Sequence, residues 1–261
     1  NDQISFGHDS YVEGGVGDDH FSANGVHGAL VYGGAGNDSF DVFAYDDTSL
    51  FGGEGADTFV GHAGGILFGG EGDDLFQLTN NADFIYAGAG NDTIYVQTMG
   101  DIHGGAGEDT VILTQQGQYL DLMSLNNTHE IESLVGSSGD DHLEAHSGSN
   151  VSVDGDETHY TGPDHIDGGA GNDTLQGGLG NQMLLGGTGD DLFYATGGTD
   201  SFDGGAGTDT LVYQHLGVVD YAQSGITADL LLGTVERHDG IYHTSSSLEQ
   251  VTGVENLIGT N

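Results

Sequence analysis

Apolar residues recur along this chain at a fixed distance after glycine-rich, acidic segments. There are eleven such segments. Each ends in an aspartate or a glutamine, and an apolar residue stands two positions later. Short apolar runs also precede several of the segments, at residues 30–32, 66–68 and 84–86. Single inward-facing apolar positions and short apolar runs bounded by glycine are typical of β-strands. The pattern therefore predicts an all-β chain of short strands joined by tight glycine-rich turns. The recurring apolar residues are Phe21, Phe40, Phe59, Phe76, Ile94, Val111, Leu143, Leu175, Leu184, Phe193 and Leu211.

The segments are copies of one nine-residue repeat, Gly-Gly-x-Gly-x-Asp-x-U-x, in which U is apolar. The copies begin at residues 14, 33, 52, 69, 87, 104, 136, 168, 177, 186 and 204. A repeat of this regularity predicts a solenoid, in which each copy is a structural unit stacked on its neighbours. A flexible glycine-rich linker, the alternative, has no fixed apolar position. The sixth position is aspartate in every copy except one, where Gln182 stands; the aspartates are Asp19, Asp38, Asp57, Asp74, Asp92, Asp109, Asp141, Asp173, Asp191 and Asp209.

The loop chemistry points to calcium. Glycine permits backbone angles closed to other residues, so Gly-Gly-x-Gly forms a tight loop with accessible carbonyls. Carbonyl and carboxylate oxygens without sulfur suit calcium, whereas magnesium demands a stricter octahedron and keeps more water. One aspartate per loop is too few for a complete site, so we expect two successive loops to share each ion.

The repeat closely resembles the calcium-binding nonapeptides of the RTX (repeats-in-toxin) family, over nearly the whole chain. The resemblance implies a parallel β-roll or β-helix solenoid with calcium between successive loops, about six to ten ions in all, interrupted by larger capping β coils. It implies that the ten aspartates above are ligands, and it leaves the sites at Gln182, Ala87 and Ser137 in doubt. It also implies backbone ligands at the loop glycines, namely Gly15, Gly17, Gly34, Gly36, Gly53, Gly55, Gly70, Gly72, Gly88, Gly90, Gly105, Gly107, Gly169, Gly171, Gly187, Gly189, Gly205 and Gly207.

The spacing of the repeats divides the chain into four segments. Over residues 1–113 the repeats start 19, 19, 17, 18 and 17 residues apart, which predicts one loop per turn and a single calcium column. Residues 114–135 interrupt the rhythm as a capping coil, and residues 136–213 form a second roll. Three repeats there start nine residues apart, which predicts loops on both sides. Residues 214–261 are expected to form a capping β coil that leads into a further repeat, and we expect the chain to be a fragment of a longer protein.

Composition supports ion-coupled folding. The chain has 42 acidic residues, one basic residue and a formal charge of −41, so it repels phosphate backbones and anionic membranes. Fifty glycines raise the entropic cost of folding, and 35% hydrophobic residues provide only a thin core. We therefore expect an expanded chain without calcium. The sequence contains no cysteine and no stretch as long as a membrane span, so neither disulfides nor membrane insertion is expected.

Other chemistries have weaker support in the sequence. The best catalytic candidate is residues 160–165 (Tyr-Thr-Gly-Pro-Asp-His), but the chain lacks lysine and its field would repel an anionic polymer. The pairs His142 with His146 and His238 with His243 suggest transition-metal sites. On a strand, however, residues four apart, as in the first pair, lie about 13 Å from each other. We expect no enzymatic activity, and a second metal at the histidines stays open.

The sequence thus predicts a calcium-binding structural segment of a large secreted or cell-surface protein. It would fold on calcium outside the cell and act as a rigid extender or as a self-assembling surface or filament element. Calcium is the expected partner, with copies of the chain or a cell-surface polymer as possible others and nucleic acid excluded. The alternatives are a module of a secreted polysaccharide-active enzyme, of the epimerase or lyase type, and a carbohydrate-binding adhesin module. The resemblance also implies export by a type I secretion system.

Overall fold

A computed structural model shows an all-β chain in two compact units. Unit 1 comprises residues 1–115 and 125–133, and unit 2 comprises residues 116–124 and 134–261. No helix long and apolar enough to cross a membrane occurs among the described residues. The structure describes residues 1–44, 47–63, 65–79, 84–97, 101–114, 119–121, 131–144, 165–177, 181–195, 199–213, 225–229, 234–238 and 247–259.

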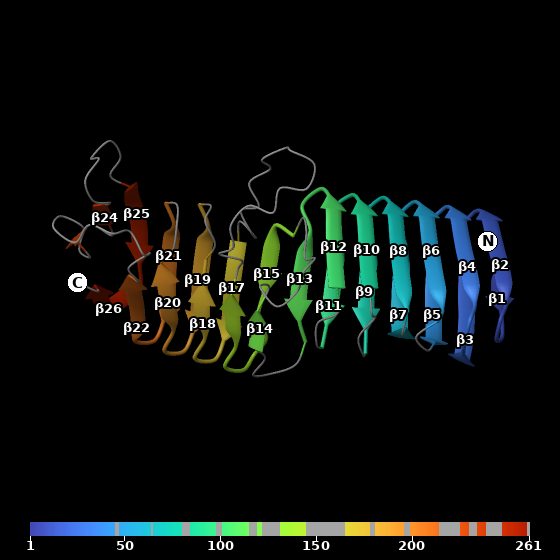
Figure 1. Ribbon diagram of the computed structural model, residues 1–261, viewed down its shortest axis with the longest axis horizontal. Helices are drawn as coiled ribbons and strands as arrows, with labels where there is room; N and C mark the ends of the chain where they lie inside the picture. The colour runs from blue at the N-terminus through green and yellow to red at the C-terminus, as the bar shows by residue number, and fades with distance from the viewer. Residues whose placement is uncertain are drawn as a thin grey trace. The chain divides into compact units, whose positions relative to one another are not determined.

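Unit 1 is a two-sheet parallel solenoid, as the sequence predicts. One sheet has the order β1-β3-β5-β7-β9-β11-β13, and the other has the order β12-β10-β8-β6-β4-β2, whose strands stand side by side in Figure 1. The first sheet contains β1 (Gln3–Ser5), β3 (His20–Val26), β5 (Ser39–Ala44), β7 (Thr58–Ala63), β9 (Leu75–Leu78), β11 (Thr93–Val96) and β13 (Thr110–Leu113). The second contains β2 (Tyr11–Val16), β4 (Leu30–Ala35), β6 (Ser49–Glu54), β8 (Ile66–Glu71), β10 (Phe84–Ala89) and β12 (Asp101–Ala106).

The core of unit 1 is built from the predicted apolar positions. Phe21, Phe40, Phe59 and Phe76 are at most 1% exposed, and their rings stack with centroids 4.7–4.8 Å apart. The return strands add buried residues from the opposite sheet, including Val31 and Leu67. Because side chains alternate along a strand, the residues on either side of these positions face outward.

Unit 2 combines parallel strands with an antiparallel extension. Its parallel strands are β15 (Ser133–Val135), β17 (His165–Ala170), β19 (Met183–Thr188) and β21 (Ser201–Ala206) in one sheet, with β14 (Tyr119–Asp121), β16 (His142–Glu144), β18 (Thr174–Gln176), β20 (Leu192–Ala195), β22 (Asp209–Tyr213) and β26 (Val254–Gly259) in the other. Beyond β21, the first sheet continues through β25 (Ser247–Thr252), β24 (Thr234–His238) and β23 (Gly225–Asp229). The pairs β23–β24 and β24–β25 are antiparallel, a reversal of direction that the repeat pattern does not predict.

Candidate metal sites in the loops

The sixth-position aspartates of unit 1 form one column. Each loop joins a strand of the β2–β12 sheet to the next strand of the opposite sheet, so every turn places one aspartate on the same side of the solenoid. The six aspartates, Asp19 through Asp109, are at most 2% exposed. One loop per turn on a single side is the arrangement that the spacing of 17–19 residues predicts.

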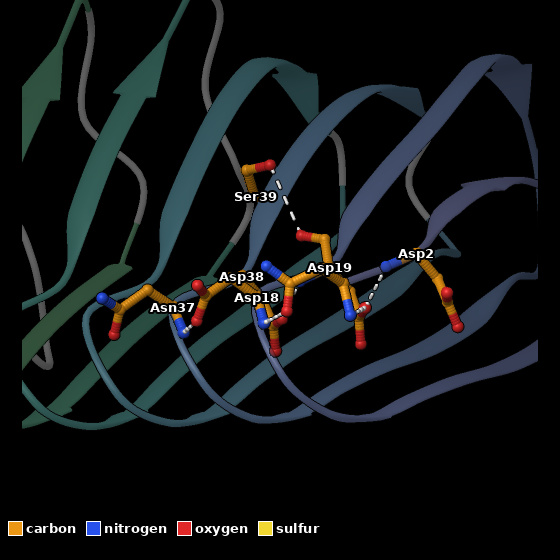
Figure 2. Close-up of polar contacts among 7 residues, drawn as sticks. Asp2, Asp18, Asp19, Asn37, Asp38 and Ser39 are labelled. Carbon is orange, nitrogen blue, oxygen red and sulfur yellow. Dashed lines mark hydrogen bonds and ion pairs between the residues drawn. The ribbon is translucent and has the colours of Figure 1, made fainter.

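Backbone hydrogen bonds link each aspartate to the next turn. The N–H of Asp19 donates to Oδ1 of Asp38 at 2.7 Å, and the same bond repeats along the column with offsets of 19, 17, 18 and 17 residues. Figure 2 shows Asp2, Asp19 and Asp38 in three successive turns, with the N–H of Asp2 bonded to Asp19. At the other end, the N–H of Asp109 donates to Oε2 of Glu132 at 2.8 Å.

Unit 2 repeats this column. The N–H of Asp141 donates to Asp173, that of Asp173 to Asp191, and that of Asp191 to Asp209, at 2.7–2.8 Å. The last donor, Asp209, is bonded to Oε2 of Glu255 at 2.8 Å, so glutamate is the final acceptor here as in unit 1. Glu132 and Glu255 occupy matching places in two similar segments, residues 131–137 and 254–260.

The second carboxylate oxygen of most of these aspartates has no hydrogen-bond donor. Oδ2 is buried and without a hydrogen-bond partner in Asp19, Asp38, Asp57, Asp74, Asp92, Asp173, Asp191 and Asp209. A buried charged oxygen without compensation costs several kcal/mol, and native proteins seldom leave one. A column of such oxygens, one per turn, is the arrangement expected for carboxylates that bind cations.

A carbonyl oxygen lies close to the same place as seven of these eight carboxylate oxygens, all except that of Asp92. A Cβ added to Gly14 would lie 2.6 Å from Oδ2 of Asp19 and 2.7 Å from the carbonyl oxygen of Gly33, one turn further along. At Gly168 the corresponding distances are 2.6 Å to Oδ2 of Asp173 and 2.8 Å to the carbonyl oxygen of Gly186. A Cβ would fill this space at Gly14 and Gly168, which accounts for the glycine at these two positions. Carboxylate and carbonyl oxygens drawn from two successive loops are the ligands that calcium prefers.

The predicted backbone ligands all lie in loops that only glycine accommodates. Every one of these glycines has a positive φ, from +86° at Gly205 to +157° at Gly207. A Cβ on Gly34 would also collide with the carbonyl oxygen of Gly15 in the preceding turn. The loop backbones are therefore closely stacked, with equivalent carbonyls superimposed along the column.

Burial raises the pKa of most of these carboxyl groups in the absence of a cation. Desolvation raises the pKa of Asp57, Asp74 and Asp173 from 3.8 to about 7. Desolvation also raises the pKa of Asp38, Asp92, Asp191 and Asp209. Asp19 is the exception, because the backbone N–H of Asp2 stabilises its charged form and lowers its pKa. The column therefore resists carrying its full negative charge unless a cation compensates it.

A second ladder at the fifth loop position runs in the opposite direction, and the sequence analysis did not predict it. The N–H of Asn37 donates to Oδ1 of Asp18 at 3.0 Å, and the N–H of Ala56 donates to Oδ1 of Asn37 at 2.9 Å. Asp18 and Asn37 are both drawn in Figure 2. Equivalent bonds join Asn91 to Asp73 and Asn172 to Asp140. Asparagine and aspartate recur at this position, and that recurrence is the signal from which the ladder could have been inferred.

Unit 2 also carries loop residues on its other side, where the nine-residue spacing predicts them. The N–H of Gln182 donates to Oδ1 of Asp200 at 3.0 Å, and the N–H of Thr199 donates to Oδ1 of Asn181 at 2.7 Å. These bonds repeat the two ladders described above. Gln182 thus keeps the buried geometry of the sixth position without its charge, while Asp200, 2% exposed, is a carboxylate absent from the predicted ligands.

The repeat at Ser137 departs from the others. The backbone N–H and the Oγ of Ser137 both donate to Oδ2 of Asp141, at 2.6 Å and 2.8 Å. The oxygen that lacks a donor elsewhere in the column is therefore bonded within its own loop. This contact gives a physical reason for the doubt that the sequence places on that site.

The remaining sequence candidates are not brought together among the described residues. Residues 160–164, His146 and His243 lie outside the described ranges. His165 begins β17, half-buried. Nowhere in the described ranges do three or more His, Cys, Asp or Glu side chains gather into a metal-binding cluster. The carboxylates are instead distributed at one per turn, close to loop carbonyl oxygens.

Comparison with known proteins agrees with this geometry. The family described as RTX calcium-binding nonapeptide repeat (4 copies) matches residues 30–42, 45–65, 66–96, 131–152, 160–181 and 177–211. No curated protein matches the chain. The matched segments cover more than half of the sequence and include most of the loops of both columns. The chain therefore belongs to the RTX calcium-binding nonapeptide repeat family, whose repeats bind calcium.

Proposed function

We propose that this chain is a calcium-folded structural segment of an extracellular or cell-surface protein, with no catalytic role of its own. The observation that carries the proposal is the column of buried carboxylate oxygens without donors, such as Oδ2 of Asp57 and Asp74. The chain has a single basic residue against 42 acidic ones, so its own side chains supply almost no neutralising charge. Bound calcium supplies that charge, held by the column aspartates and the loop carbonyls.

Calcium binding on this scale controls whether the chain folds. A ligand that binds only the folded state at about ten times its dissociation constant adds about 1.4 kcal/mol per site. Several sites together rival the whole stability of a typical domain, about 5–15 kcal/mol. A calcium concentration that is low inside cells and high outside them would keep such a chain unfolded until export. This coupling supports an extracellular location and a role as a rigid extender or as an assembling surface element.

Sedimentation velocity across a calcium titration, begun in chelator, tests this function. We expect a slow, expanded species in chelator and a compact species in calcium, with a matching gain of β-structure by far-ultraviolet circular dichroism. Magnesium at the same concentration is the control and should compact the chain far less, because it demands a stricter ligand geometry. Identical sedimentation in chelator and in calcium would contradict the proposal.

A further inference from the structure

The outer face of the β2–β12 sheet in unit 1 carries an apolar surface that the calcium sites do not use. In its four central strands, β4, β6, β8 and β10, the residues preceding and following each buried position face outward and are half-buried or exposed. Phe84 is 37% exposed although it is large and apolar. We call this surface the aromatic face; it consists of Leu30, Tyr32, Ser49, Phe51, Ile66, Phe68, Phe84 and Tyr86.

Aromatic rings form a continuous row across this face. Tyr32 stacks on Phe51 and Phe51 on Phe68, with centroids 4.6 Å apart and planes within 14° of parallel. The row continues through Tyr86, 5.0 Å from Phe68, to His103, 4.6 Å from Tyr86. Each inner ring has a neighbour on both of its faces, so the row presents ring edges to its surroundings. The strand register fixes this arrangement, since Tyr32, Phe51, Phe68, Tyr86 and His103 are successive register partners.

The aromatic face is also free of charge in a strongly acidic chain. None of its eight residues is Asp, Glu, Lys, Arg or His, whereas the whole chain has a formal charge of −41. Ionisable residues stand at its two ends: Glu13 pairs in register with Tyr32 on one side, and Asp101 and His103 belong to β12 on the other. Two acidic molecules repel each other over most of their surfaces. They can approach at this face because no like charges would lie opposite each other there. Apolar patches on otherwise polar proteins mark interaction sites.

We propose that the aromatic face is a docking surface for a second copy of the chain. The two faces pack as a sheet on a sheet, about 10 Å apart, with a two-fold axis along the strand direction. That axis places β12 of one copy opposite β2 of the other, so His103 of each molecule meets Glu13 of its partner. The contact joins apolar residues in the centre to complementary polar groups at the rim, as protein interfaces do. It requires the folded roll, and in that respect it rests on the proposed function.

A sugar polymer is the less favoured occupant. Aromatic side chains bind sugars through an open ring face, and the inner rings of this row are covered on both faces by their neighbours. Ring edges and the aliphatic side chains of Leu30 and Ile66 suit a flat apolar partner instead. A copy of the same sheet provides such a partner.

Sedimentation velocity of the whole chain in calcium, over a range of protein concentrations, tests the docking surface. The wild type should form a dimer, and Phe68→Lys should weaken self-association at least tenfold by placing charge in the centre of the contact. Val60→Lys is the matched control, because Val60 is 40% exposed on the outer face of the opposite sheet. It should leave the dimer intact. Circular dichroism in calcium verifies that both variants are folded.

A second variant avoids any effect of Phe68 on folding. The chain has no cysteine, so Ser49→Cys introduces a single thiol at the centre of the face. A bis-maleimide of about 10 Å span, the spacing of packed sheets, should link two such chains, whereas Thr93→Cys on the opposite sheet should stay unlinked. A compact monomer at all concentrations would overturn the docking surface while leaving the calcium-dependent fold intact. A monomer retarded on a neutral polysaccharide matrix would overturn it in favour of sugar binding.

Discussion

Asp74 and Asp92 occupy equivalent positions in successive turns, and the N–H of Asp74 donates a 2.7 Å hydrogen bond to Oδ1 of Asp92. The Oδ2 atom of Asp92 is buried and has no hydrogen-bond partner. The two oxygens of this carboxylate thus have different roles: Oδ1 accepts a hydrogen bond from the preceding turn and holds it in register, and Oδ2 is available to a cation. This division couples the stacking of the solenoid to the loading of its loops.

Removing one charge from the column should weaken calcium-dependent folding. Asp74→Asn retains an oxygen that can accept the bond from Asp57, but it removes the anionic ligand. We expect the folding equilibrium constant at fixed calcium to fall at least about tenfold, the equivalent of about 1.4 kcal/mol, and the calcium concentration at half-folding to rise. Circular dichroism in a calcium titration measures the midpoint, and isothermal titration calorimetry measures the lost binding.

Asp73→Asn is the matched control for that experiment. Asp73 belongs to the fifth-position ladder and accepts a bond from the N–H of Asn91, whose own side chain already plays the same role one turn later. Asparagine is thus native to this ladder, and the folding equilibrium constant at fixed calcium should change less than about threefold, less than 1 kcal/mol. An equal effect of both substitutions would show that charge alone, without position, governs folding.

The calcium-free chain should gain structure as the pH falls. Desolvation raises the pKa of Asp57, Asp74 and Asp173 to about 7 in the folded state, from an ordinary value of 3.8. The folded state therefore binds these protons more tightly than the unfolded state does. Their contribution to stability is fully present below about pH 4 and is lost as the pH rises through about 7. In chelator, the β-sheet signal should increase between pH 8 and pH 5.

Because these protons themselves stabilise the folded state, the calcium concentration at half-folding should fall as the pH falls from 8 to 5. A chain with Asp57, Asp74 and Asp173 all changed to Asn is the control, because it lacks the three groups that titrate near pH 7. Its signal in chelator should depend much less on pH. A wild-type signal that is flat from pH 8 to pH 5 would contradict the linkage.

The sequence predicts the loop column well because its determinants are local. Gly14 and Asp19 lie within one repeat, and their contact follows from the loop itself, so the nine-residue pattern identifies both. The offsets of 17–19 residues then give the register between turns. The fifth-position ladder was missed because Asp18, Asn37 and Ala56 share no single residue type, although the bond needs only an acceptor from one turn and a backbone N–H from the next.

The aromatic face was beyond sequence analysis for a different reason. Tyr32 and Tyr86 belong to predicted strands, but which side of the sheet they occupy depends on the pairing of strands that are 17–19 residues apart. Only the observed register aligns Tyr32 with Phe51 and Tyr86 with His103. The antiparallel pairing of β23, β24 and β25 likewise lies outside the repeats, where no fixed period indicates the direction of a strand.

Replacing glycine by alanine should lower the free energy of unfolding far more in the stacked loops than outside them. Gly70 has a φ of +128°, and a Cβ there would collide with the carbonyl oxygen of Gly53. Gly70→Ala should therefore reduce the free energy of unfolding in calcium by more than about 2 kcal/mol, through both clash and backbone strain. Gly7→Ala is the control: a Cβ at Gly7 meets nothing within 4 Å, and its change should stay within about 0.5 kcal/mol. Urea denaturation at fixed calcium measures both, and similar losses would argue against close stacking of the loops.

Truncating one phenylalanine of the buried stack in the core of unit 1 should leave a cavity that its neighbours cannot fill. Phe59 is 1% exposed, and its ring lies between those of Phe40 and Phe76 at centroid distances of 4.7 Å. Its neighbours are held in place by strand pairing on both sides, so they cannot move into the space. Phe59→Ala should lower the free energy of unfolding by about 3–5 kcal/mol, whereas Phe43→Ala, at a residue 43% exposed on the outer face, should cost less than about 1 kcal/mol. Denaturation at saturating calcium separates this loss of packing from a loss of ions. An effect of Phe59→Ala that vanishes at saturating calcium would mean that ions, and not the aromatic core, hold the turns together.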